Sequence, residues 1–358
     1  RQCLPADWLL VMQIARNLET VLRYPDAAAL LLPEGRLPRG ADQSSRAERL
    51  PLPGLADALE IVAAEGADGF YRGPVAEATA RASQAAGGIL TTEDLAAYRP
   101  RILREEPRRY RDHDYIACWD QVAYEALNVL ANFDLAAMGP DSLAYRHLMA
   151  EALAVGFVDN IAHYGDPEFV PDSPVDALAD PALGRRRAEM LSLEKALPRP
   201  VQAIADLAPG WQGTARLADP EPWPPKLSGT SQVAAADAEG NMCSLITSVS
   251  GFFGSYLVVP EYGFVLNNGM GNFDPRPGRP NSIAPGKMPI FAAPPLLALK
   301  DGKAVFAAGG CGGYRIETGV LHTFLHWADF GMDLRQALEH PRVHCQGKDT
   351  HVDSRIPA

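Results

Sequence analysis

The fold of this chain is decided by a short stretch that begins Ser228-Gly-Thr-Ser-Gln-Val-Ala-Ala-Ala-Asp237 and continues Ala238-Glu-Gly-Asn-Met-Cys-Ser-Leu-Ile-Thr-Ser-Val249. Two strand-like runs, Gln232 to Ala236 and Met242 to Val249, flank a turn through residues 237–241. This pattern predicts a β-hairpin. Thr230 then stands at the start of an apolar strand, directly after Gly229.

A threonine in that position becomes a catalytic group if the chain is cut before it. An N-terminal threonine carries a hydroxyl nucleophile and its own general base, the α-amine. With a pKa of roughly 7.7 to 8.0, that amine is partly neutral near physiological pH. Gly229 leaves its carbonyl sterically accessible and tolerates a strained turn. The alternative interpretation is a Gly-Thr pair that merely starts a strand.

Composition limits the class of protein. The chain has 358 residues, of which 47% are hydrophobic, and this is enough for a sizeable core in one or two domains. A net charge of −11 disfavours nucleic acid as a partner. No apolar run reaches the roughly 18 residues that cross a bilayer, so no membrane partner is expected.

Cysteine usage and the first residue bear on location. The five cysteines are odd in number and scattered, which argues against a disulfide framework or a zinc site. We expect no metal and no cofactor. A chain that opens on Arg1 suggests that its true start lies elsewhere. A cytoplasmic location is the expectation, with a periplasmic or secreted location as the alternative.

The first half of the chain shows helical periodicity and the second half shows strands. Apolar residues recur every three or four positions at 55–64, 75–85, 122–135 and 143–163, and Thr91 with Asp94 predicts a capping box. Residues 197–225 predict an exposed connection. Further strands are predicted at 257–259, 264–266, 295–299 and 304–307, and a helix at about 318–330. Helices first and strands later favour an α+β fold.

Several motifs follow one another in a fixed order. They are Thr230, Asp237 to Asn241, Leu266-Asn267-Asn268, Pro280-Asn281 and Gly312-Gly313-Tyr314-Arg315, with Asp68 to Gly73 and Gly87 to Tyr98 upstream and Ala337 to Val343 downstream. In this order they resemble the γ-glutamyltranspeptidase family of N-terminal nucleophile hydrolases. The resemblance covers most of the chain, although the family's opening strand and helices, with an arginine for the substrate carboxylate, have no counterpart here.

The resemblance implies a four-layer αββα sandwich, cut at Gly229-Thr230 into two interleaved subunits that form one structural domain. Residues 1–229 would form the large-subunit portion and residues 230–358 the small-subunit portion. It also implies an amide hydrolase or acyltransferase that works through an acyl-Thr230 ester on a small-molecule amide. A homodimer is a further possibility. A γ-glutamyltranspeptidase or glutathione hydrolase, and an unprocessed non-catalytic homologue, are the alternatives.

Four other residues are predicted to support Thr230. Ser248 and Ser250 stand where the family places a threonine and an asparagine that bind the nucleophile, and strand alternation predicts that both serines lie on one face. Serine at position 250 has a shorter side chain than the asparagine of the family, so it reaches less far toward the nucleophile. The backbone N–H groups of Gly312 and Gly313 are predicted to bind a developing oxyanion, as the same glycines do in the family. A simple turn is the alternative.

The predicted substrate pocket departs from the family pattern. In the segment from Asn268 to Phe273, Gly269 and Asn272 replace the amide and carboxylate side chains that hold the glutamate α-amine. Phe291 and Ala292 replace two serines that hold the α-carboxylate. Charged hydrogen bonds of this kind contribute about 1.5 to 3 kcal/mol each. We therefore expect a pocket that is uncharged, partly apolar and unable to hold a γ-glutamyl group.

The remaining candidates have simpler interpretations. Arg315 could meet an acidic substrate group, but a pair with Glu317 or a buried acid is the stronger expectation. His322 and His326 share a helix face without the glutamate of a metalloprotease motif. Cys311 could be a nucleophile, but no histidine lies near it in the sequence. The acids Asp159, Asp166 and Glu168 are expected to cap loops.

Overall fold

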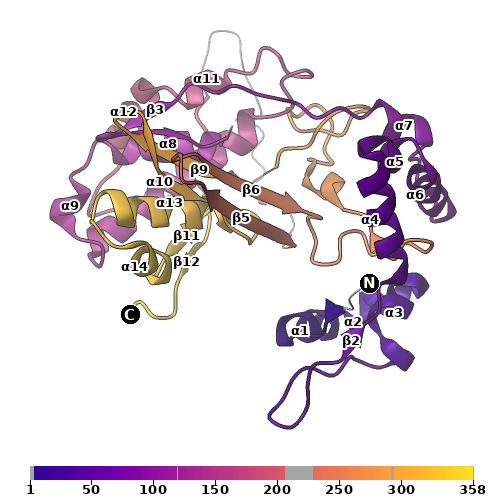
Figure 1. Cartoon of the computed structure of the whole chain (residues 1–358). Helices are drawn as coiled ribbons and strands as arrows, with labels where there is room; N and C mark the ends of the chain where they lie inside the picture. The colour runs from indigo at the N-terminus through magenta and orange to yellow at the C-terminus, as the bar shows by residue number, and fades with distance from the viewer. Residues whose placement is uncertain (1–3, 119, 206–228, 292–293, 358) are drawn as a thin grey trace. The chain divides into compact units, whose positions relative to one another are not determined.

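The computed structural model describes residues 4–118, 120–205, 229–291 and 294–357 (Figure 1). The chain divides into two compact units: unit 1 comprises residues 1–103 and 249–268, and unit 2 comprises residues 104–248 and 269–358. Each unit takes residues from both sides of Thr230. The division into subunit portions 1–229 and 230–358 stays a prediction, as does their interleaving in a single domain.

Unit 1 is mostly helical and has a small apolar core made by Ile14, Val21, Leu31, Leu32 and Phe253. Asp7 starts the first helix by accepting a hydrogen bond from the Leu10 amide at 2.7 Å. The predicted capping box of Thr91 and Asp94 is confirmed. The elements of unit 1 are α1 (Trp8–Arg16), α2 (Leu18–Arg23), α3 (Pro25–Leu31), η1 (Pro33–Gly35), α4 (Pro53–Glu65), α5 (Ala67–Tyr71), α6 (Pro74–Ala85), α7 (Thr92–Ala97), β1 (Leu4–Pro5), β2 (Arg49–Leu50), β7 (Val258–Val259) and β8 (Phe264–Val265).

Unit 2 mixes helices with strands, which confirms the α+β prediction. Its helices are α8 (Gln121–Leu130), α9 (Leu135–Met138), α10 (Leu143–His163), α11 (Val175–Leu178), α12 (Pro181–Met190), α13 (Arg315–Ala328) and α14 (Leu334–Glu339), with the 3₁₀ turn η2 (Gly269–Asn272). Its strands are β3 (Arg108–Tyr110), β4 (His113–Ile116), β5 (Thr230–Ala236), β6 (Met242–Ser248), β9 (Leu296–Lys300), β10 (Lys303–Ala308), β11 (Val343–Cys345) and β12 (Thr350–Val352).

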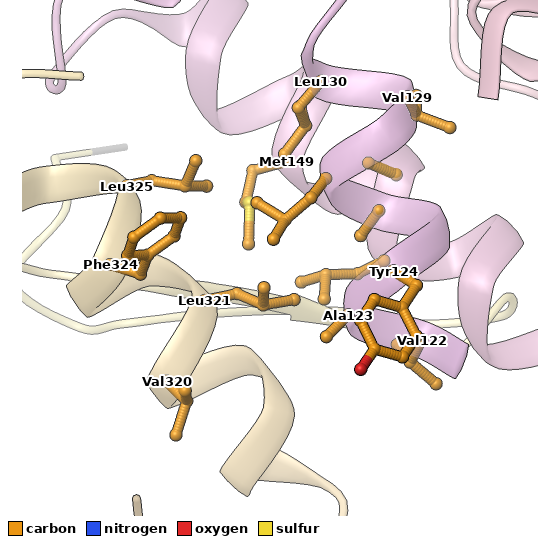
Figure 2. Packing of buried hydrophobic residues seen from close by; sticks show 14 of the residues in the cluster. Val122, Ala123, Tyr124, Val129, Leu130, Met149, Val320, Leu321, Phe324 and Leu325 are labelled. Atoms are coloured by element: carbon orange, nitrogen blue, oxygen red, sulfur yellow. The ribbon is translucent and has the colours of Figure 1, made fainter. Parts of the chain in front are cut away.

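An antiparallel sheet in the order β10-β9-β4-β3 runs through unit 2. Tyr115 of β4 pairs with Ala298 of β9, so the sheet joins segments from both sides of Thr230. Phe306 of β10 lies 5.5 Å from Phe324 of α13, measured between ring centroids. Figure 2 shows how α13 and the helices that follow β4 turn their apolar side chains toward one another. This core packs against the four-stranded sheet, while the β5–β6 hairpin that carries the candidate site forms a separate two-stranded sheet.

Most of the predicted elements are present, and the differences have local causes. The helix predicted at 122–135 ends at Leu130, because Asp134 caps a separate helix through the Ala137 amide at 3.0 Å. The strand predicted to reach Val249 ends at Ser248. The predicted connection at 197–225 lies partly outside the described residues. Up to residue 205 it has no regular structure. Within the described ranges, no helix is long and apolar enough to cross a membrane.

Two histidines of α13 are buried in the core of unit 2. His322 and His326 are 1% and 0% exposed. Nε2 of His322 lies 3.0 Å from the Val343 carbonyl oxygen. Burial, reinforced by a neighbouring histidine in each case, lowers the pKa of His322 to about 3 and that of His326 to about 4. Both rings are therefore neutral in the folded protein near pH 7.

We predict that acid destabilises the folded chain through these two rings. In the unfolded chain they titrate near pH 6.5, so below that pH the unfolded state binds protons that the folded state excludes. Stability is complete above about pH 6.5 and falls toward pH 4, by up to about 1.36 kcal/mol per pH unit for each ring. Urea unfolding between pH 7.5 and 4.5 measures the slope of the unfolding free energy against pH. In the double variant His322→Gln, His326→Gln the slope should be clearly shallower, and an unchanged slope would contradict the assignment.

Candidate active site

The β5–β6 hairpin brings the predicted nucleophile and its predicted support together. Thr230 and Ser248 are direct partners in the antiparallel register. Their hydroxyl oxygens lie 3.0 Å apart. Side chains opposite one another in such a pair share a face of the sheet. The pairing of these two residues therefore follows from the register alone.

Ser248 also reaches the bond that precedes Thr230. Its Oγ donates a hydrogen bond to the Gly229 carbonyl oxygen at 3.2 Å. A hydroxyl has one proton, so when Ser248 donates to Gly229, the Thr230 hydroxyl donates to Ser248. Three polar groups of the unbroken chain are thus linked: the Thr230 hydroxyl, the Ser248 hydroxyl and the Gly229 carbonyl.

The turn of the hairpin fixes this register. Asp237 Oδ1 accepts a hydrogen bond from the Asn241 amide at 2.8 Å, and Oδ2 accepts one from the Asn241 side chain at 2.7 Å. The Asn241 side chain and amide lower the pKa of Asp237. Gly240 has a φ of +88°, which a side chain would disfavour. The predicted turn through 237–241 is therefore confirmed in detail.

The glycine turn before α13 has the backbone shape that only glycine adopts freely. Gly312 and Gly313 have φ values of +141° and +60°. Upstream of them, a Cβ on Gly309 would lie 2.6 Å from Cγ of Gln232 and 3.1 Å from Cδ1 of Ile246. Absence of a side chain at Gly309 thus lets this turn approach the strand that begins at Thr230. The oxyanion role of Gly312 and Gly313 stays a prediction.

Ser250 does not lie on the same strand face as Ser248, so that prediction is wrong. The strand β6 ends at Ser248, and Ser250 has a φ of +67° in the turn that follows. Ser250 and Asn268 belong to unit 1. There the Asn268 side chain accepts a hydrogen bond from the Gly251 amide at 2.6 Å. The roles predicted for Ser250 and Asn268 at the nucleophile and substrate stay predictions.

The other residues predicted to bind substrate lie in η2 and in the long connection between η2 and β9. Gly269 and Asn272 are the first and last residues of η2, and Asn272 is 8% exposed. Phe291 is 49% exposed. Ala292 lies outside the described residues. A contact of these residues with substrate stays a prediction.

The negative charge of the single acid in this connection is already balanced by two arginines. Between positions 269 and 291 the sequence has one acid, Asp274. It accepts hydrogen bonds from Arg276 at 2.7 and 2.8 Å, and Arg279 lies 3.4 Å away. Burial alone would raise the pKa of Asp274, but the bonds from Arg276 and the two positive charges lower it. The carboxylate is thus held by two arginines rather than turned to a ligand cation.

Of the two partners expected for Arg315, Glu317 or a buried acid, Glu317 does not fit, since its Oε2 has no hydrogen-bond partner among the described residues. Residues two apart lie on different sides of a helix. Glu317 is 2% exposed, and burial, followed by the charge of Asp120, raises its pKa well above the usual value. Arg315 instead lines a cavity of about 590 Å³, together with Cys311 and His344. Thr230, Gly312 and Gly313 are not among the lining residues. Contact of Arg315 with a substrate acid stays a prediction.

Sequence reasoning missed two roles. Asp166 is 2% exposed and accepts a hydrogen bond from the Met288 amide at 2.7 Å, in addition to capping its own loop at Glu168. Asn281 was identified only as part of a motif, and its side chain bonds both the Asn272 carbonyl oxygen and the Ile290 amide. Across the described ranges, no group of three or more His, Cys, Asp or Glu side chains could hold a metal ion.

Comparison with known proteins identifies the family of the chain. The gamma-glutamyltranspeptidase family model matches residues 2–358. The chain belongs to this family, and its fold is that of the N-terminal nucleophile hydrolases.

Its relatives include two kinds of proenzyme. The Acylase ACY 1 proenzyme of Pseudomonas sp. (strain SE83) is 35% identical over 96% of this chain and 58% of its own length. The Glutathione hydrolase proenzyme of Escherichia coli (strain K12) is 30% identical over 92% of this chain and 55% of its own length. The chain thus spans just over half the length of these relatives.

A solved structure shows the same fold. Cephalosporin acylase from Bacillus halodurans matches 99% of this chain and 62% of its own, with a TM-score of 0.79 and 27% identity. The recognised family and the fold agree with the expectations drawn from the motifs.

We predict that Gly309→Val disturbs the contact between the glycine turn and the hairpin, whereas Gly310→Ala does not. A Cβ at Gly310 has Cγ2 of Ile316 as its nearest contact, at an ordinary 3.4 Å. Overpacking of the kind expected at Gly309 costs about 1 to 3 kcal/mol. Thermal and urea unfolding of both variants measures the difference. Equal stability of the two variants would contradict the close approach.

Proposed function

We propose that this chain forms the catalytic part of a self-cleaving amide hydrolase or acyltransferase whose nucleophile is Thr230. The observation that carries this proposal is the linked set of the Thr230 hydroxyl, the Ser248 hydroxyl and the Gly229 carbonyl. It joins the attacking group, a hydroxyl that relays a proton, and the carbonyl under attack. The proenzyme relatives add support, because their names imply processing of a precursor.

In the first step Thr230 Oγ1 attacks the Gly229 carbonyl carbon. The hydrogen bond from Ser248 to the Gly229 oxygen stabilises the negative charge that develops there. The carbon–nitrogen bond then breaks, the threonine nitrogen takes up a proton, and an ester joins Gly229 to Thr230. Water hydrolyses that ester, which leaves a carboxylate on Gly229 and a free amine on Thr230.

The freed amine then serves substrate turnover. It removes the proton from the Thr230 hydroxyl as the hydroxyl attacks the amide carbonyl of the substrate. The leaving amine takes a proton, and an acyl-Thr230 ester forms. We assign stabilisation of the oxyanion to the N–H groups of Gly312 and Gly313. Water is the expected acceptor of the acyl group, and transfer to an amine is the other outcome of the same chemistry.

The substrate class follows from the charges of the recognition segments. Gly269 and Asn272 offer no carboxylate to an ammonium group, and Asp274 is held by Arg276 and Arg279. Phe291 adds an exposed aromatic surface. We therefore propose a small or acyl-capped amide whose acyl group has no α-amine. The N-terminal threonine would belong to a small subunit that stays bound to the large subunit from the same precursor.

A γ-glutamyl substrate is the second candidate, since the relative from Escherichia coli is named a glutathione hydrolase. A third candidate is a homologue that folds without cleaving, retained for binding or assembly. The two variants and the substrate comparison that follow separate these three cases.

We predict that Thr230→Ala abolishes both self-cleavage and turnover in the full-length protein, because it removes the only proposed nucleophile. Cys311→Ala should leave both rates within about twofold of the unaltered protein. N-terminal sequencing and intact mass should find a fragment that begins at Thr230 in the unaltered protein and in the cysteine variant. Loss of cleavage in the cysteine variant alone would reverse the assignment, and a fully active unbroken chain would exclude it.

We also predict a preference among acyl anilides. The γ-glutamyl anilide should be turned over at least about tenfold less efficiently than an anilide with an uncharged acyl group of similar length, because one or two charged hydrogen bonds are missing. Steady-state kcat/KM for the two compounds measures the ratio. Turnover of the γ-glutamyl compound at the higher rate would favour the second candidate.

A further inference from the structure

Asn281 lies between the two segments that are proposed to recognise the acyl group. The first segment ends at Asn272 in η2, and the second contains Ile290 and Phe291. Nδ2 of Asn281 donates to the Asn272 carbonyl oxygen at 2.7 Å. Oδ1 of the same side chain accepts from the Ile290 amide at 3.0 Å. One carboxamide therefore spans both segments.

The orientation of this carboxamide is fixed by its partners. A carbonyl oxygen needs a donor and an amide N–H needs an acceptor, so the reverse orientation of the Asn281 side chain would lose both bonds. Asn281 is 6% exposed, which leaves water little access to either bond. Its own carbonyl oxygen also accepts from the Asp274 amide at 2.9 Å.

The second segment is held to the rest of unit 2 by separate contacts. Met288 donates its amide to Asp166, in the loop that follows α10, at 2.7 Å. The Lys287 ammonium group donates to the Pro280 carbonyl oxygen at 2.6 Å. These contacts restrain the residues on one side of Asn281, while the bond to Asn272 restrains the other side. The spacing between the two segments depends on Asn281.

We propose that Asn281 is a positioning residue that sets the acyl selectivity of this enzyme. The two segments that it joins expose apolar side chains, with Met270 63%, Met288 40% and Phe291 49% exposed. An uncharged, apolar acyl group is the ligand that such surfaces favour. Asn281 fixes the separation of these surfaces, and its side-chain bonds join neither Thr230 nor the glycine turn. This inference rests on the proposed function and adds a residue that selects the substrate.

Two substitutions test the role in the full-length protein. Asn281→Ala removes both side-chain bonds. Asn281→Asp keeps an acceptor for the Ile290 amide but places an oxygen against the Asn272 carbonyl. Asn128→Ala is the matched control, since Asn128 is 8% exposed in α8 and donates a single hydrogen bond to the Ala179 carbonyl oxygen at 2.9 Å. The control loses a similar buried bond in a helix that carries no recognition residue.

We expect Asn281→Ala to raise KM for an apolar acyl anilide by about tenfold, with kcat within about twofold. The ranking of short, medium and aromatic acyl groups by kcat/KM should change, and the rate of self-cleavage should not. Asn281→Asp should give the same change of ranking, because it loses the bond to the Asn272 carbonyl oxygen. Asn128→Ala should lower stability comparably without moving KM or the ranking. If Asn281→Ala fails to fold, the aspartate variant decides the matter alone.

An unchanged acyl ranking in both Asn281 variants would overturn the proposal. So would an equal loss of kcat for every acyl group together with slower self-cleavage, because that pattern belongs to a general structural role. Binding in the Thr230→Ala background, measured by calorimetry with the same anilides, gives a readout that needs no turnover. If Thr230→Ala retains turnover, the proposed function fails, and this failure is distinct from an unchanged ranking.

Discussion

The candidate site depends above all on the register of one hairpin. The side-chain period of a strand is two, so a slip of one residue would turn Thr230 to the opposite face and away from Ser248. Asp237 and Asn241 prevent that slip by closing the turn with three hydrogen bonds, two of them to the Asp237 carboxylate. Gly309 adds a second restraint, because its missing side chain lets the glycine turn contact Gln232 and Ile246. The proposed nucleophile is thus placed by groups that have no proposed part in the chemistry.

Sequence reasoning predicted the features that are local in the chain. The alternation in β5 and β6 and the turn residues between them specify the hairpin without reference to the rest of the fold. The long helix α10 was predicted with the bounds that it has, 143–163, because its periodicity and its Ser142 cap lie within one continuous stretch. The family motifs also identified Gly312 and Gly313. Their φ values of +141° and +60° are backbone conformations that favour glycine.

The features that the sequence could not predict are contacts between residues far apart in the chain and local backbone conformation. Asp166 contacts Met288 across 122 positions, and no periodicity links two such residues. The positive φ of Ser250 removes that residue from the strand face that alternation assigned to it. Arg315 was expected to pair with Glu317 or a buried acid because such arginines usually find a fixed partner. Only the fold reveals that Glu317 is buried, where burial and then the charge of Asp120 raise its pKa.

The four-stranded sheet of unit 2 explains why the proposed cleavage need not separate the two products. Strand β4 precedes Thr230 in the chain and β9 follows it, yet they are paired neighbours in the sheet of unit 2. The Val201 amide donates to the Gly347 carbonyl oxygen at 2.7 Å, which joins the two parts again at another point. Breaking the bond after Gly229 removes none of these contacts, and it leaves both strands of the hairpin on the same side of the cut. The proposed cleavage would therefore free the Thr230 amine while both products continue to share the four-stranded sheet of unit 2.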